Sequence, residues 1–154
     1  MVKIIILMAS LLTAVSCGSS NGGKDKNRND KSNEALAGFS LSKAKIFQVK
    51  AEWAMPLKAG GNGDNSVLLT FLDSAGAPGV STKLLAFHPR MPAMGHGTDE
   101  STQVILNAEA TPNVVTVSGI YFNMGGSAGE WVVDLNVEID DTVDISQLSV
   151  PNVD

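Results

Sequence analysis

The chain has 154 residues, with 11 Lys and Arg against 16 Asp and Glu, and so carries a formal net charge of −5. A hydrophobic content of 44% and a charged content of 18% fit one globular domain with a tail, and exclude both a chain disordered throughout and an integral membrane bundle. The single Cys excludes an intramolecular disulfide and a Cys-rich metal site, and the acidic balance argues against nucleic acid as a partner.

The N-terminus has the pattern of a secretory signal. Lys3 precedes about twelve mostly apolar residues, Ile4 to Val15, which are too few to span a bilayer as a helix. Cys17 follows a run of small residues and resembles the acylated first residue of mature bacterial lipoproteins. We therefore expect a signal peptide at 1–16 and a lipidated Cys17 that anchors the chain in the bacterial cell envelope, facing the periplasm or in the outer membrane. The alternative is a cleaved signal in which Cys17 is incidental.

The charge distribution divides the rest of the chain. Residues 17–42 are mainly small and polar, which predicts a flexible tether. After Arg90 the sequence has ten acidic residues and no Lys or Arg. This part of the protein should therefore have a negative potential that attracts cations and repels anions.

Alternating apolar and polar residues predict strands in the body of the chain. The clearest case is residues 131–139, in which Trp131, Val133, Leu135, Val137 and Ile139 alternate with polar positions. The other expected strands are residues 47–53, 67–72, 80–87, 103–109 and 114–122, separated by turns rich in Gly, Asn and Asp.

About seven short antiparallel strands at even spacing predict an all-β, immunoglobulin-like β-sandwich over residues 43–142. A small barrel is the alternative. The last three expected strands should form a meander, and residues 143–154 are expected to be a C-terminal tail.

The segment from His88 to Gly97 departs from the strand pattern, because its two Pro and two Gly predict a loop. It contains both His of the protein as well as Met91 and Met94, and Met124 lies in another turn. Thioether sulfur is a soft, neutral ligand that suits Cu(I). The spacing of Met91, Met94 and His96 could place two sulfurs and one nitrogen around a single ion.

Packing is the competing explanation for the same residues. Met side chains beside prolines can close the open end of a sandwich core, and a His between two Gly can hold a loop through a hydrogen bond to a carbonyl. The chemistry of the residues alone leaves both interpretations open.

Three segments also resemble a known family. Residues 91–97 (Met-Pro-Ala-Met-Gly-His-Gly), 119–126 and 130–133 look like the YtkA-like domain, which is related to FixH-like proteins, and the likeness covers about residues 47–140. It implies a membrane-tethered or secreted β-sandwich associated with copper handling or cytochrome oxidase assembly. By matching position, Met91, Met94 and His96 are the candidate ligands, with Met124 close by, whereas His88 lies outside the family pattern.

Other site classes fit less well. A blue-copper centre needs a Cys thiolate, and the only Cys is at the expected anchor. No nucleophile elbow accompanies His96, so we expect no enzyme, and the acids at 140–144 lack EF-hand spacing. The leading hypothesis is a lipid-anchored copper carrier or chaperone that passes Cu(I) to a metal-receiving protein. The alternative is a structural or interaction module of the envelope that binds no metal.

Overall fold

A computed structural model describes residues 34–60, 63–78, 81–98, 104–107 and 113–154, and gives the backbone alone for His96 and residues 104–107. Both sheets and the core described below lie within the compact unit Lys31–Asp154. This unit therefore contains all the described strands and the core of the domain. The expected signal peptide, Cys17 and the first part of the tether lie outside the described residues.

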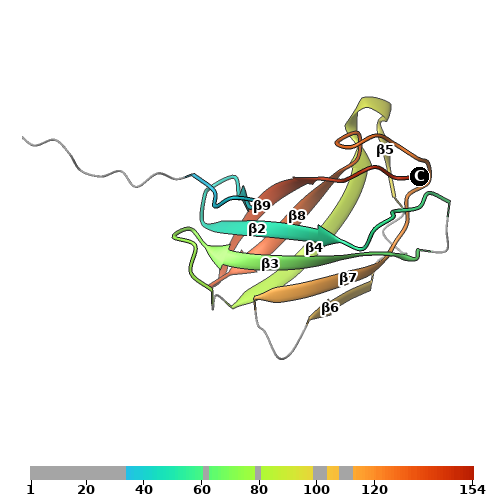
Figure 1. Cartoon of the computed structure of the whole chain (residues 1–154). Coiled ribbons are helices and arrows are strands. Elements are labelled where there is room, and N and C mark those ends of the chain that lie inside the picture. Colours follow the sequence, from blue (N-terminus) through green and yellow to red (C-terminus); the bar gives the residue numbers. More distant parts are fainter. Residues whose placement is uncertain (1–33, 61–62, 79–80, 99–103, 108–112) are drawn as a thin grey trace, which may run out of the picture. The chain divides into compact units, whose positions relative to one another are not determined.

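Two antiparallel sheets make up the domain (Figure 1). The first sheet has the order β1-β2-β3-β7-β6 and the second the order β5-β4-β8-β9. The strands are β1 (Ser40–Leu41), β2 (Phe47–Trp53), β3 (Asn65–Asp73), β4 (Thr82–Met91), β5 (His96–Gly97), β6 (Val104–Asn107), β7 (Val114–Ile120), β8 (Val132–Ile139) and β9 (Thr142–Ser149), and a 3₁₀ helix, η1 (Pro92–Met94), joins β4 to β5.

The strand order is that of an immunoglobulin constant-type sandwich. Without the two-residue strands β1 and β5, the sheets of the described residues read β2-β3-β7-β6 and β4-β8-β9. These orders match the four-stranded ABED and three-stranded CFG sheets of that fold. The prediction of an all-β, immunoglobulin-like sandwich of about seven strands is confirmed.

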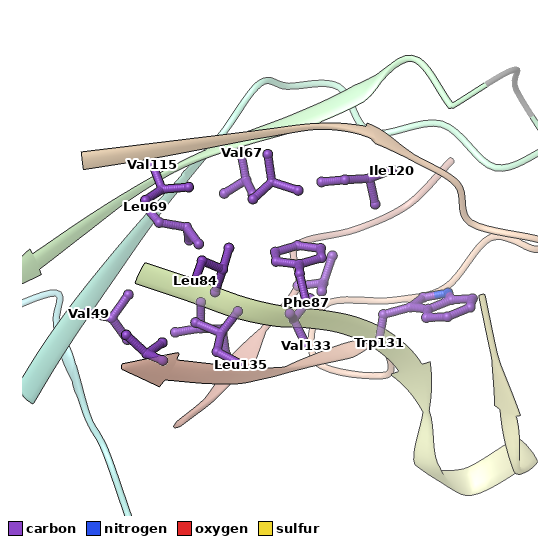
Figure 2. Close-up of a cluster of buried hydrophobic side chains, with 14 of the residues drawn as sticks. Val49, Val67, Leu69, Leu84, Phe87, Val115, Ile120, Trp131, Val133 and Leu135 are labelled. Carbon is purple, nitrogen blue, oxygen red and sulfur yellow. The ribbon is translucent and has the colours of Figure 1, made fainter. Parts of the chain in front are cut away.

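The core lies between the sheets. Figure 2 shows Leu69 and Val115 of the first sheet facing Leu84 and Leu135 of the second. At one end of this core the aromatic rings of Trp53, Phe87, Phe122 and Trp131 form a connected cluster. The rings of Phe122 and Trp131 lie 5.1 Å apart in an edge-on arrangement.

A β-bulge in β4 decides which side chains reach this core. Leu84 pairs with Val137 and Ala86 pairs with Asn136, so Leu85 is an extra residue in the strand. Because side chains alternate along a strand, the extra residue shifts the alternation by one position. After the bulge, Phe87 and Met91 face the core.

The predicted loop at 88–97 is wrong over most of its length, because His88 to Met91 belong to β4, Pro92–Met94 form η1 and His96–Gly97 form β5. Pro89 fits in the strand because of where its backbone points. Its carbonyl accepts a hydrogen bond from Thr98 N (3.2 Å), on the side away from β8. The N and the C=O of a residue in an antiparallel pair point to the same side of the strand. The missing N–H of Pro89 therefore removes no hydrogen bond to β8.

The predicted meander of the last three expected strands is also wrong. β6 pairs with β7 in the first sheet, but β8 pairs with β4 and β9 in the second. The segment between β7 and β8 therefore crosses from one sheet to the other, as the connection between the corresponding strands of an immunoglobulin domain does.

Residues 143–154 are not a tail, and the domain extends beyond 43–142. β9 pairs with β8 along its whole length, and Val153 packs in the core. Sequence patterning missed β9 because its inward positions include Asp144 and Ser146, while the apolar Val143 and Ile145 point outward. The buried Asp144 carboxylate is satisfied by the backbone N–H of Ala44 at 2.9 Å. At the other boundary, β1 lies within the expected tether.

Candidate functional site

A hollow of about 270 Å³ opens at the end of the sandwich where the aromatic cluster lies. We call it the methionine hollow, because three of its lining residues are Met. The described residues that line it are Met91, Ala93, Met94, Met124, Gly125 and Glu130. In Figure 1 the hairpin that carries β5 and the chain between β7 and β8 lie at this same end.

Two stretches of the chain, far apart in the sequence, supply the three methionines. Met91 is the last residue of β4, Met94 ends η1, and Met124 lies in the segment between β7 and β8. The short η1 helix begins at Pro92, which is favourable at a helix start, and is followed by Gly95 in the left-handed conformation (φ 67°). This turn holds Met91 and Met94 on one hollow although they belong to different elements.

The three side chains differ in exposure. Met91 is 5% exposed and belongs to the core, whereas Met94 is 54% exposed. Met124 is half-buried and packs against the core. The hollow therefore joins a buried sulfur position to one that solvent, an incoming ion or another protein can reach.

Gly126 lies against two residues that line the hollow, Met91 and Glu130. A β-carbon at this position would lie 3.0 Å from Trp131 Cδ1, 3.1 Å from Met91 Cε and 3.2 Å from Glu130 Oε2. Three chemically different side chains therefore converge on one point that any larger residue would occupy. Figure 2 places the Trp131 indole at the end of the core, beside the β4–β5 hairpin.

Trp131 also has an unsatisfied polar group. Its side chain is 0% exposed, and Nε1 has no hydrogen-bond acceptor among the described residues. A buried donor without a partner is unfavourable, and such groups are uncommon in folded proteins. The orphaned N–H belongs to the ring that contacts the Gly126 position, so it lies close to the hollow.

Glu130 is a residue of the hollow that the sequence analysis did not assign to a site. Its Oε2 accepts a hydrogen bond from Ser127 N at 2.7 Å, across the turn that precedes β8. This contact fixes a carboxylate beside the methionines. The sequence signal was the acid directly before Trp131, a position expected to belong only to the polar face of a strand.

The two His are separated. The backbone of His96 pairs directly with that of Met91, at the edge of the methionine hollow, but its side chain lies outside the described part of the structure. His88 pairs with Asp134 in the β4–β8 ladder and is on the outward face of β4. The structure thus brings Met91, Met94 and Met124 together and leaves His88 away from them.

The donor set of the hollow is three thioethers and one carboxylate. No group of three or more His, Cys, Asp or Glu able to hold a metal is found among the described residues. The His and Cys clusters typical of zinc sites and the carboxylate clusters typical of calcium or magnesium sites are thus not seen in that part of the chain. Thioether donors instead suit a soft ion such as Cu(I).

Comparisons with protein families, with curated proteins and with solved structures find no significant match. In the described ranges no helix is both long and apolar enough to cross a membrane.

Proposed function

We propose that this protein is a lipid-anchored envelope lipoprotein that binds Cu(I) as cargo in the methionine hollow. Met91, Met94 and Met124 are the proposed sulfur ligands, and His96 is the proposed nitrogen ligand. The protein acts as a carrier or chaperone, or in oxidase assembly, rather than as a catalyst. The observation that carries the proposal is the convergence of three methionines on one hollow, two from the junction of β4 and η1 and one from the distant segment between β7 and β8.

The surroundings of the sulfurs support a monovalent soft cation. Thioethers are neutral, so they do not offset the charge of a bound ion. Glu130 supplies one negative charge at the rim, and the C-terminal half of the sequence is strongly acidic. Both favour a cation at this end of the domain.

The unequal exposure of the ligands suits transfer. An ion held by buried Met91 and half-buried Met124 is shielded from solvent, while exposed Met94 is open to ligands from a metal-receiving protein. A cargo site needs both properties, because the ion must be held during transport and released on contact.

The proposed location rests on the N-terminus. Lys3, the apolar run to Val15 and Cys17 form the lipoprotein pattern, and the tether would connect the lipid to the sandwich. Replacing Cys17 by Ser should move the protein from the membrane fraction to the soluble fraction. If the Cys17→Ser protein stays in the membrane fraction, Cys17 is not the anchor.

The alternative proposal is a structural or interaction module that binds no metal. It is favoured by the burial of Met91 and by the packing of Met124 against the core. A role in stabilising the core explains both observations without a metal. Exposed Met94 is the residue that separates the two proposals, because packing does not account for a methionine that is mostly in solvent.

A competition titration separates them. The unit Lys31–Asp154 contains no Cys, so no thiol competes for copper. Under a Cu(I)-specific chelator we expect a dissociation constant below about 1 μM, and a loss of about tenfold or more in Met94→Ala and Met124→Ala, since even outer contacts of metal sites change affinity by about 10–100-fold.

Met55→Ala is the matched control, because Met55 is 57% exposed, much like Met94, but lies outside the hollow. Equal affinities of Met94→Ala, Met55→Ala and the parent would contradict copper binding at the hollow. His96→Ala tests the proposed nitrogen ligand separately.

A further inference from the structure

A second pocket lies on the outward face of the second sheet and is larger than the methionine hollow, at about 680 Å³. We call it the outer pocket. Its polar lining residues include Lys43, His88, Arg90, Asp134, Asn136 and Gln147. Its volume falls in the range of small-molecule sites, which span roughly 300–1,000 Å³.

The bulge at Leu85 creates the floor of this pocket. By shifting the alternation of β4, it turns His88 and Arg90 outward, where they lie opposite Asp134 and Val132 of β8. One wall comes from the chain after β1, which is fixed to the edge of β9 by a hydrogen bond from Lys43 N to Ile145 O (2.8 Å). Three strands and a docked segment thus build the pocket.

A hydrogen-bond network holds the floor in place. Arg90 Nε and Nη2 donate to the two carboxylate oxygens of Asp134, and Gln147 Nε2 donates to Asp134 Oδ1 at 2.8 Å. Burial acts to raise the pKa of Asp134, but the hydrogen bonds from Arg90 and Gln147 and the charges of Arg90 and His88 lower it below its ordinary value. The carboxylate stays ionised and orients the Arg90 guanidinium.

The charge of the outer pocket contrasts with that of the surrounding sequence. Lys43 and Arg90 are both cationic, and Asp134 is the single acid in the lining, whereas residues 91–154 contain ten acids and no Lys or Arg. The two contacts to Asp134 engage Nε and Nη2, and a guanidinium carries five N–H donors. Ser146 and the apolar Leu41 and Ile145 complete the lining.

We propose that the outer pocket binds a small organic anion, a short-chain carboxylate whose charged end meets Lys43 and Arg90 and whose apolar end lies against Leu41 and Ile145. The polar amides of Asn136 and Gln147 lie beside the bound carboxylate. This site is separate from the methionine hollow and does not depend on copper binding.

Butanoate is the probe, and the side-chain amides of Asn136 and Gln147 are the reporters. We expect their NMR signals in the ¹⁵N-labelled unit Lys31–Asp154 to shift and saturate, with a dissociation constant on the order of 1 mM for so small a ligand. Butanamide, which has the same shape without the charge, should cause no saturable shift. Unsaturated shifts, or equal shifts with butanamide, would overturn the proposal.

Charge reversal at Lys43 locates the site. Lys43→Glu should weaken butanoate binding about tenfold or more, and Lys43→Gln should have an intermediate effect. Lys83→Glu is the matched control, because Lys83 is on the outward face of β4 but lies outside the pocket, with its Nζ 3.8 Å from Oε2 of Glu138. An equal loss in the two Glu variants would show a general charge effect and refute the proposed site.

Discussion

The two faces of β4 after its bulge carry different chemistry. Phe87 and Met91 point inward, and Met91 lines the methionine hollow, while His88 and Arg90 point outward and line the outer pocket. The alternation of the strand puts Met91 and Arg90 on opposite faces, and the extra residue Leu85 decides which of them faces the core. Neighbouring residues of one strand can therefore belong to two unrelated sites, and the bulge decides which residue belongs to which site.

Two single-residue deletions in β4 provide the strongest test of this comparison. Deleting Leu85 should restore a regular strand in which Leu84, Phe87 and Met91 all still face the core. Deleting His88 should instead reverse the alternation on one side of the deletion. Phe87 leaves the core if the residues before the deletion shift, and Met91 leaves it if the residues after the deletion shift. We expect a loss of about 3–5 kcal/mol for the His88 deletion and of about 1 kcal/mol or less for the Leu85 deletion.

Urea unfolding of both deletion variants measures the difference. Similar losses for the two deletions would contradict the role of Leu85 as the residue that sets the alternation.

Within the methionine hollow, Met91 and Met94 should separate stability from binding. Met91→Ala removes a buried side chain and is expected to cost about 2–5 kcal/mol of unfolding free energy. Met94→Ala removes an exposed one and should change stability by less than about 0.5 kcal/mol. Thermal unfolding without copper checks both values, and a large loss in Met94→Ala would favour the packing alternative.

Gly126→Ala should have a smaller effect on the same hollow. The new β-carbon would lie about as close to Trp131 and Met91 as any real carbon contact allows, which predicts a loss of about 1–3 kcal/mol by overpacking. Gly97→Ala is the control, because among the described residues its β-carbon would meet only Pro89 O, at an ordinary 3.6 Å. Equal melting temperatures for the two variants would show that Trp131 and Met91 can move to accommodate the new β-carbon at position 126.

The sequence predicted the sandwich because most inward positions are apolar and alternate regularly, as at Val133, Leu135 and Val137. It also identified all three methionines of the hollow, because Met beside Pro and Gly is conspicuous outside a core pattern. It missed Glu130 and the outer pocket. Both depend on which elements lie side by side, as Lys43 does beside Ile145, and patterns within one segment carry no such information.

On the outward face of the second sheet, the substitution Asp134→Asn in β8 should have the smallest effect, and one that depends on pH. The folded-state pKa of Asp134 is lowered, so its charge stabilises the fold above the ordinary Asp pKa of about 3.9, and this contribution is lost as the pH falls through the lower folded value. The stability gap between the parent and Asp134→Asn should therefore be open at pH 7 and close below about pH 4. The Arg90–Asp134 pair is partly exposed, so salt should also narrow the stability gap at pH 7.

Urea unfolding at a series of pH values measures this stability gap. Asp141→Asn, in the turn between β8 and β9, is the control that removes an equal charge. A gap that stayed constant to pH 2 would show that the Asp134 charge does not stabilise the floor of the outer pocket.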